Sequence, residues 1–498
     1  MNVNPITRLD YPDPDVIRVE DTYYMVSTTM LFMPGCEILQ SFDLVHWEHV
    51  TYVYETLDHT DAQQLKSGQN IYGQGMWAAS LRYHEGRFCI CFVANDTRKT
   101  YLYTSEKIDG PWKKQLIEGF YHDGSLLFDE DGRNYIVYGN DEIWITELNE
   151  DLTAPKKDGL HRLLVSDHKN PELGYEGSHI QKINGYYYIF LVHSLRDRWM
   201  RTEACFYSDS LEGEFTGGDV LCDDRGYCGQ GVAQGGIVDT PDGKWYAMLF
   251  QDSGAVGRIP ILLPVTWKDH FPFFGQNGHV PEEIEVHSTR PGYIYQPLVG
   301  SDDFCNGLLP RWQFNHDPDP RYYHLDALQG TYTITTREVC TELTQAVNTL
   351  TQRMSYPSCA AEVTVDASAL KEGDVAGLCA LQSCYAAVGI TKHHGKYEVL
   401  MLDKKEDGIL DMTEGTVVES HQMDFRLEAD FCNMKDEARC YYRVNKGDWL
   451  PIGTVHKLYF KLDHFTGCRF GLFCYAAEET GGSACFRDFK YYDVDEIS

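Results

Sequence analysis

Three acidic residues occupy the same place relative to the apolar segment that follows them. Asp13 lies in YPDPDVI, Asp123 in HDGSLLFD and Glu176 in YEGSHIQKI, each beside a proline or a glycine. Three carboxylates brought together repel one another, which raises at least one pKa. A neutral carboxylic acid near an ionised one can cleave a glycosidic bond, because one protonates the leaving oxygen and the other activates water. Each acid alone also suits an ordinary turn, so the hypothesis depends on the recurrence.

The acids can meet only if a repeated unit brings their segments together. A turn followed by an aromatic-rich apolar run recurs about every 50 residues, and a second short apolar run precedes each one. Each pair of runs predicts a β-hairpin. The aromatic centres of the five hairpins are Tyr23, Phe88, Tyr135, Tyr187 and Tyr246.

Repeats of this length with several strands each are typical of a β-propeller with one blade per repeat. The pattern therefore predicts a five-bladed β-propeller over residues 1–295, and the alternative is an ordinary β-sandwich with similar hairpins. In a propeller the innermost strands surround one axis, so the three acids would share one mouth.

The sequence pattern changes near residue 300. The stretch PGYIYQPLVGSDDF reads as a linker, and short apolar runs such as GTYTITT, CAAEVTVD and RFGLFCYA follow it without a long helical period. These features predict a second all-β domain of sandwich type over residues 300–498.

The amino-acid composition limits the kinds of molecule that the chain is expected to bind. The formal net charge of −32 over 498 residues argues against nucleic acids, anionic membranes and acidic substrates, because their charges would be repelled. A neutral substrate fits best. The chain begins MNVNPITRLDYPDPD without a basic and then apolar segment, so no signal peptide is visible and we expect a cytoplasmic location. The alternative is a mature form that has lost its signal peptide. The sixteen cysteines include no Cys-x-x-Cys pair, and we expect free thiols rather than a disulfide framework or a zinc site.

The motifs resemble those of glycoside hydrolase family 43, especially its two-domain β-xylosidase and α-L-arabinofuranosidase members, over nearly the whole chain. The segment YPDPDVIRVEDTYYMVSTT resembles the opening motif of the family, which implies that Asp13 is the general base. HDGSLLFDEDGRNYIVYG resembles the segment whose acid tunes and orients the proton donor, here Asp123. YEGSHIQKINGYYYIF resembles the general-acid segment, with Glu176 as the acid. The family fold is a five-bladed propeller, followed in this branch by a concanavalin-like jelly roll.

The resemblance also implies residues that bind the sugar. GMWAASLRYHEGRF places Trp77 against the sugar, GAVGRIP places Arg258 near its hydroxyls, and FMPG makes Phe32 a wall of the pocket. For each of them a core or surface role is the alternative. Gln234 stands where many relatives carry an axial histidine that helps hold calcium, which puts a calcium site in doubt. Its side chain still offers a carbonyl oxygen to substrate or water. No cofactor is expected to be required.

These observations predict an inverting exo-glycosidase that releases terminal β-D-xylose or α-L-arabinofuranose from hemicellulose oligosaccharides such as those of xylan and arabinoxylan. In this branch a loop of the sandwich often closes the pocket, which favours exo action. The alternatives are a retaining fructosidase-type propeller, an endo-acting arabinanase and a sugar-binding propeller without turnover. The predicted partner is a neutral oligosaccharide, and the resemblance is compatible with a homo-oligomer.

Overall fold

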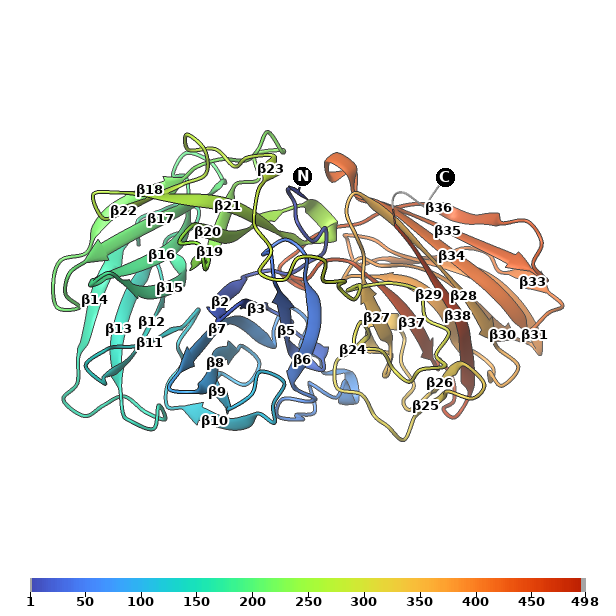
Figure 1. Cartoon of the computed structure of the whole chain (residues 1–498). Helices are drawn as coiled ribbons and strands as arrows, with labels where there is room; N and C mark the ends of the chain where they lie inside the picture. The colour runs from blue at the N-terminus through green and yellow to red at the C-terminus, as the bar shows by residue number, and fades with distance from the viewer. Residues whose placement is uncertain (1, 494–498) are drawn as a thin grey trace.

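The computed structural model describes residues 2–493, and almost all of its regular structure is β-strand. Within that range the helical segments are four short 3-10 turns: η1 (Lys66–Gly68), η2 (Gly254–Val256), η3 (Leu343–Gln345) and η4 (Cys432–Met434). The chain forms two bodies, a propeller coloured blue to green and a sandwich coloured yellow to red (Figure 1). The predicted order of a five-bladed propeller followed by a β-sandwich is confirmed. No helix in the described part of the chain is long and apolar enough to cross a membrane.

Each blade is a four-stranded antiparallel sheet built from consecutive parts of the chain. The blades are β2-β3-β5-β6 (Asp15–Val19, Thr22–Val26, Gly35–Ser41, Glu48–Tyr54), β7 to β10 (Met76–His84, Arg87–Ala94, Lys99–Ser105, Lys113–Ile117), β11 to β14 (Ser125–Phe128, Asn134–Asn140, Glu142–Leu148, His161–Ser166), β15 to β18 (Glu176–Ile183, Tyr186–Ser194, Arg201–Ser208, Thr216–Leu221) and β19 to β22 (Val232–Asp239, Trp245–Asp252, Arg258–Lys268, Phe271–Phe274).

The five predicted hairpins join the first two strands of each blade. Two of their turns, Glu85–Gly86 and Asn184–Gly185, contain two residues that both have positive φ, with values of 48° and 78° and of 50° and 83°. This is the type I′ geometry, whose twist matches that of the flanking strands and which glycine and asparagine adopt readily. Apolar side chains pack between neighbouring blades, as Val26 and Ile38 do with Leu81.

The N-terminal segment ties the ring of blades together. Strand β1 (Asn2–Val3) pairs with β23 (Glu283–Ile284), which follows the fifth blade. The Asn4 amide then donates to the Leu262 carbonyl at 2.8 Å and accepts from the Leu262 N–H at 3.0 Å. The start of the chain is thereby held against blade five before it enters blade one.

The second domain consists of two packed antiparallel sheets. One has the order β32-β31-β30-β29-β37-β27-β24-β4, with β33 also on β31: Leu410–Met412, Lys396–Lys404, Ala386–His393, Val375–Leu381, Arg469–Tyr475, Leu350–Arg353, Gln313–Asn315, Phe32–Met33 and Thr416–Val418. The other has the order β25-β26-β38-β28-β34-β35-β36: Tyr323–Asp326, Thr331–Thr335, Ser483–Asp493, Ser358–Asp366, Gln422–Asp430, Glu437–Val444 and Leu450–Lys457. The predicted boundary at residues 295–300 lies in the connection between β23 and β24.

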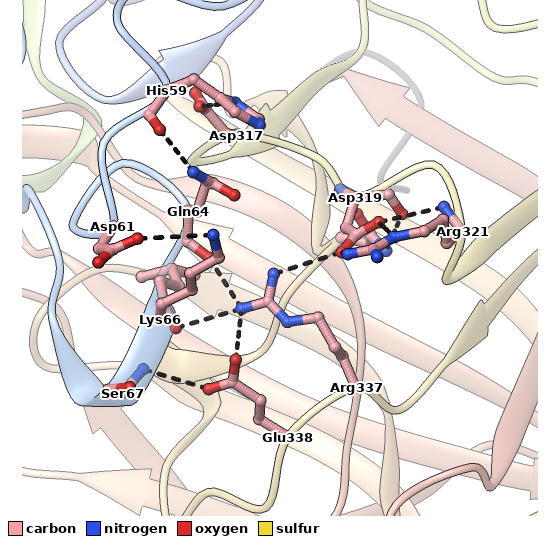
Figure 2. Close-up of polar contacts among 12 residues, drawn as sticks. His59, Asp61, Gln64, Lys66, Ser67, Asp317, Asp319, Arg321, Arg337 and Glu338 are labelled. Atoms are coloured by element: carbon pink, nitrogen blue, oxygen red, sulfur yellow. Dashed lines mark hydrogen bonds and ion pairs between the residues drawn. The ribbon is translucent and has the colours of Figure 1, made fainter.

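The two domains share a sheet. Strand β4 belongs to the first blade by sequence but pairs with β24 of the sandwich, with Met33 opposite Phe314. Farther along the interface, a loop of the propeller meets the sandwich through polar contacts (Figure 2). His59 Nδ1 lies 2.7 Å from Asp317 Oδ2, and Arg337 Nη2 donates to the Gln64 carbonyl at 2.9 Å. The sandwich is therefore docked along one side of the propeller.

Candidate active site

The innermost strands begin with backbone irregularities that turn acidic side chains toward the propeller axis. Asp13 and Asp123 lie two residues before β2 and β11 and have φ of 52° and 48°, in the left-handed region. Glu176 opens β15 at a bulge, and the next residue, Gly177, has φ of 67°. A side chain at position 177 would place its Cβ 2.7 Å from Gln234 Cγ, so glycine is required there. Bulges at the ends of strands commonly aim side chains at active sites.

The three predicted carboxylates meet in one cavity of about 510 Å³ at the mouth of the propeller. The cavity lining contains groups from all five blades together with groups from the sandwich. Its residues are Asp13, Trp77, His122, Asp123, Glu172, Leu173, Glu176, Trp199, Arg201, Gln230, Gln234, Asp252, Gly254, Arg258, Met434, Phe460, Leu462 and Phe465.

Asp13 is buried and oriented by two donors. Thr28 Oγ1 donates to Asp13 Oδ2 at 2.6 Å, and Arg258 Nη1 donates to Oδ1 at 3.1 Å. Arg258 is itself buried, so this ion pair is shielded from water. The two donors hold both carboxylate oxygens of Asp13 in one orientation at the wall of the cavity.

Asp123 and Glu176 share a histidine neighbour. His122 Nε2 lies 3.6 Å from Asp123 Oδ2 and 3.5 Å from Glu176 Oε2, which are ion-pair rather than hydrogen-bond distances. Asn140 Nδ2 donates to Glu176 Oε2 at 2.6 Å, and the Gly177 N–H donates to Asp123 Oδ2 at 3.0 Å. Each carboxylate is therefore held by one donor and faces the same imidazole.

This cluster separates the pKa values of its members. Burial raises the pKa of Asp123 to about 6. The negative charge of Asp123 raises the pKa of His122 to about 9, with Glu176 adding to the effect. Burial also raises the pKa of Glu176, but His122, Arg201 and Asn140 together outweigh burial and hold it below its ordinary value. The higher carboxyl pKa thus belongs to Asp123, whereas the sequence hypothesis assigned the proton to Glu176.

Trp77 forms a half-buried wall of the cavity. Its ring lies between His122 and Phe465, with centroid separations of 6.1 Å and 5.4 Å. Its buried Nε1–H has no hydrogen-bond partner among the described residues. A buried indole N–H normally finds a partner, so this N–H is an unsatisfied donor beside the cavity.

Gln234 lies on the axis, but the residues around it do not fit a calcium ion. One layer deeper, the Asp15 carboxylate is paired with Arg82 Nη1 at 2.8 Å and with His179 Nδ1 at 3.1 Å. The Gln234 N–H donates to Glu203, whose complete burial raises its pKa well above the ordinary value. Calcium takes about six to eight oxygen ligands, and this axis offers a carboxylate already paired with a guanidinium.

Phe32 requires a correction, because the structure places it outside the cavity. Strand β4 carries it into the interdomain core, where it is fully buried and lies beneath the Arg469 guanidinium, 3.4 Å from the ring centre. The prediction that Phe32 forms a wall of the pocket is therefore wrong. The sandwich supplies the aromatic wall instead, through Phe460 and Phe465.

Several residues of the site were not predicted. His122 stands directly before Asp123 in the quoted motif, and its position beside an acid was the available signal. Arg201 is buried, pairs with Asp252 at 2.8 Å and lies 5.3 Å from the ring centre of Trp199. Only the docked sandwich places Phe460, Leu462 and Phe465 at the cavity, so no local pattern identifies them.

Comparisons with known proteins agree with this architecture. Residues 3–272 match the family model "Glycosyl hydrolases family 43", and residues 301–492 match "Beta xylosidase C-terminal Concanavalin A-like domain". A β-xylosidase of Formosa agariphila is 26% identical over 554 residues, covering 99% of this chain and 89% of the relative. A non-reducing end α-L-arabinofuranosidase of Bacteroides ovatus is 24% identical over 432 residues, covering 82% of this chain and 79% of the relative.

A solved structure extends the comparison. A bifunctional GH43-CE protein of Bacteroides eggerthii superimposes with a TM-score of 0.93 at 41% identity, covering all of this chain. This chain spans 64% of that protein, less than two thirds of its length. With the family model covering more than half of its residues and the carboxylates gathered at the propeller mouth, the chain belongs to glycosyl hydrolases family 43 and is a glycoside hydrolase.

Proposed function

We propose that the chain is an inverting exo-glycosidase that releases terminal β-D-xylose, α-L-arabinofuranose or both from xylan and arabinoxylan oligosaccharides. The observation that carries the proposal is a single cavity that contains Asp13, Asp123 and Glu176 and is walled by the sandwich. The relatives described above are named for these two sugars. Xylose and arabinofuranose present similar hydroxyl arrangements, so one pocket can accept both.

In this proposal Asp13 is the general base and Glu176 the general acid. Asp13 removes a proton from the attacking water, while Glu176 protonates the oxygen of the leaving group. Arg258 and Thr28 hold Asp13 in a single orientation. An inverting reaction needs the two carboxyls about 6.5–9.5 Å apart, so that water fits between the sugar and the base.

His122 supplies the proton that Glu176 needs. Before the substrate binds, protonated His122 and ionised Glu176 form a charge pair with their atoms 3.5 Å apart. A neutral sugar that fills the cavity expels water, and a desolvated charge pair then becomes costly relative to two neutral groups. A proton that leaves His122 can pass to either neighbouring carboxyl, and the proposal places it on Glu176 during turnover.

The sandwich wall favours exo action. Phe460, Leu462 and Phe465 line the cavity opposite the propeller residues. A polysaccharide cannot run through a pocket that is closed on one side, whereas a chain end can enter it. The substrate is accordingly a short neutral oligosaccharide rather than the interior of a polymer.

We also propose that the enzyme acts without a cofactor and in the cytoplasm. The hydrolysis described needs no cofactor or metal. All sixteen cysteines are free, as expected for a reducing compartment, and this supports cytoplasmic action. Light scattering after size-exclusion chromatography decides whether the chain forms a homo-oligomer.

The first test is nitrophenol release from the β-xyloside and the α-arabinofuranoside by the native chain and by Glu176→Gln. We expect release from at least one substrate and a large loss in the variant, limited because nitrophenol leaves with little help from an acid. No release by well-folded native protein would favour a sugar-binding propeller.

Product stereochemistry separates the remaining alternatives. Proton NMR of the first product formed from a xylo-oligosaccharide should show the inverted anomer. Retention would indicate a fructosidase-type double displacement. Release of oligosaccharides rather than monosaccharides from arabinan would indicate an endo-acting arabinanase.

A further inference from the structure

Asp10 lies three residues before Asp13 and outside the cavity, yet it touches both domains. Its side chain is buried, and its two carboxylate oxygens accept backbone N–H groups from separate parts of the chain. Oδ1 accepts from the Arg258 N–H at 2.7 Å, and Oδ2 accepts from the Gly467 N–H of the sandwich at 2.8 Å. A carboxylate is suited to this position because both of its oxygens accept hydrogen bonds.

Two glycines allow the backbones to come this close. A Cβ at Gly257, where φ is 106°, would lie 2.3 Å from Asp10 Oδ1. A Cβ at Gly467 would lie 2.2 Å from the Val256 carbonyl oxygen and 2.7 Å from Asp10 Cβ. A side chain at Gly257 would displace Asp10, and one at Gly467 would displace both the Val256 carbonyl and Asp10.

The backbone groups that Asp10 holds belong to residues that shape the cavity. Arg258 contacts Asp13 through Nη1 at 3.1 Å and the Phe465 carbonyl through Nη2 at 3.4 Å. Its guanidinium carbon also lies 4.3 Å from the centre of the Phe465 ring. Phe465 is two residues before Gly467. Asp10 therefore accepts hydrogen bonds from the backbone of Arg258 itself and from the backbone close to Phe465.

The turn that leads into Arg258 is embedded in the sandwich. Ala255 and Val256, in η2, belong to the apolar core of the sandwich. The Cys468 N–H donates to the Ala255 carbonyl at 2.8 Å. The turn and the sandwich loop are therefore packed and hydrogen-bonded to each other, and Asp10 connects both to the segment carrying Asp13.

We propose that Asp10 is a positioning residue, which couples the sandwich wall of the cavity to the Asp13–Arg258 pair. The kinetic part of this inference rests on the proposed glycosidase function. In Asp10→Asn one acceptor oxygen becomes an NH₂ group that faces a backbone N–H. One of the two backbone hydrogen bonds is therefore lost, with almost no change in volume.

The matched control is Asp317→Asn. Asp317 is also a buried carboxylate at the domain interface, but it contacts His59 in the region drawn in Figure 2 and does not line the cavity. We expect Asp10→Asn to lower kcat/KM on the preferred nitrophenyl glycoside about tenfold, mostly through kcat. The control should stay within about twofold of the native chain. Equal losses in both variants would overturn the proposal, since general weakening of the interface would explain them.

A second measurement does not depend on turnover. Hydrogen exchange of peptides covering residues 253–259 and 458–468 should be about tenfold faster in Asp10→Asn and unchanged in Asp317→Asn. Unchanged exchange in Asp10→Asn would refute the coupling. If the native chain hydrolyses neither glycoside, the proposed function fails while the exchange experiment still decides the role of Asp10. If Asp10→Asn does not fold, Gly257→Ala places its Cβ 2.3 Å from Asp10 Oδ1, disturbs the same contact and should accelerate exchange in both peptides.

Discussion

Arg258 forms hydrogen bonds both to Asp13, the proposed general base, and to Phe465 in the sandwich wall of the cavity. Its Nη1 donates to Asp13 Oδ1 at 3.1 Å, and its Nη2 donates to the Phe465 carbonyl at 3.4 Å. A guanidinium can make these contacts together because its donors are arranged in a rigid plane. The orientation of Asp13 therefore depends on a residue whose position the second domain helps to set.

Replacing this arginine by lysine tests the arrangement. Arg258→Lys keeps the charge but loses the planar fork, so Asp13 loses its fixed orientation. We expect kcat/KM for the nitrophenyl glycoside to fall about 10²-fold. Arg290→Lys, which alters an exposed ion pair with Asp21, is the control and should leave the kinetics unchanged. Near-native turnover by Arg258→Lys would show that the contact is dispensable.

The pH dependence of kcat/KM tests the role of His122 as proton donor to Glu176. The pKa of His122 is raised to about 9, so the cluster keeps its proton below that pH and loses it above. The basic limb of the profile should therefore lie near pH 9 in the native chain. In His122→Gln we expect this limb to move down by about two pH units or more, because the proton must then be held by the carboxyls alone.

The comparison needs a histidine outside the site. His84 stacks on Phe128 away from the cavity, and His84→Gln should keep the native profile. If the basic limb of His122→Gln stays where it is in the native chain, His122 does not supply the proton.

The repeated part of the architecture could be read from the sequence. Five hairpins of similar composition predicted five blades, and the common position of the acids predicted that Asp13, Asp123 and Glu176 meet. This worked because the propeller converts equivalent sequence positions into neighbouring places around one axis. The sandwich strands were also partly predictable, since the run at Cys359 and that at Arg469 coincide with β28 and β37.

Contacts that depend on docking of the two domains could not be read in this way. Phe32 was expected in the pocket, but β4 pairs with the sandwich and carries it into the interdomain core. Phe465 reaches the cavity from a segment more than 200 residues after Arg258 in the chain. The order of proton affinity was also missed, because it depends on His122 lying between the two carboxylates.

Substitutions of Trp77 show whether this residue binds the sugar or only packs in the core. Its buried Nε1–H is without a partner among the described residues, and its ring faces the cavity. Trp77→Phe retains a ring but removes the donor, and we expect about a tenfold loss in kcat/KM, equivalent to one hydrogen bond. Trp77→Ala also removes the stacking surface and should cost about 10²-fold or more.

The matched aromatic control is Trp144→Phe. Trp144 stacks on His161 in an outer part of the third blade, and its replacement should leave the kinetics unchanged. If Trp77→Ala lowered only the melting temperature and kept native kinetics, Trp77 would be a core aromatic.

Asp436 predicts a pH-dependent stability. It accepts a hydrogen bond from the Ala255 N–H at 3.1 Å, and burial raises its pKa to about 6, above the value of about 3.9 in an unfolded chain. The folded state binds this proton more tightly than the unfolded chain does. The contribution of protonated Asp436 to the free energy of unfolding is therefore complete below about pH 3.9 and is lost as the pH rises through 6.

Asp436→Asn keeps an acceptor without the buried charge. We therefore expect a Tm at pH 8 about 2 °C above that of the native chain, with the gain shrinking as the pH falls from 6 toward 4. Asp209→Asn, at an exposed position, should give no such trend. A gain independent of pH would rule out the Asp436 carboxylate as its source.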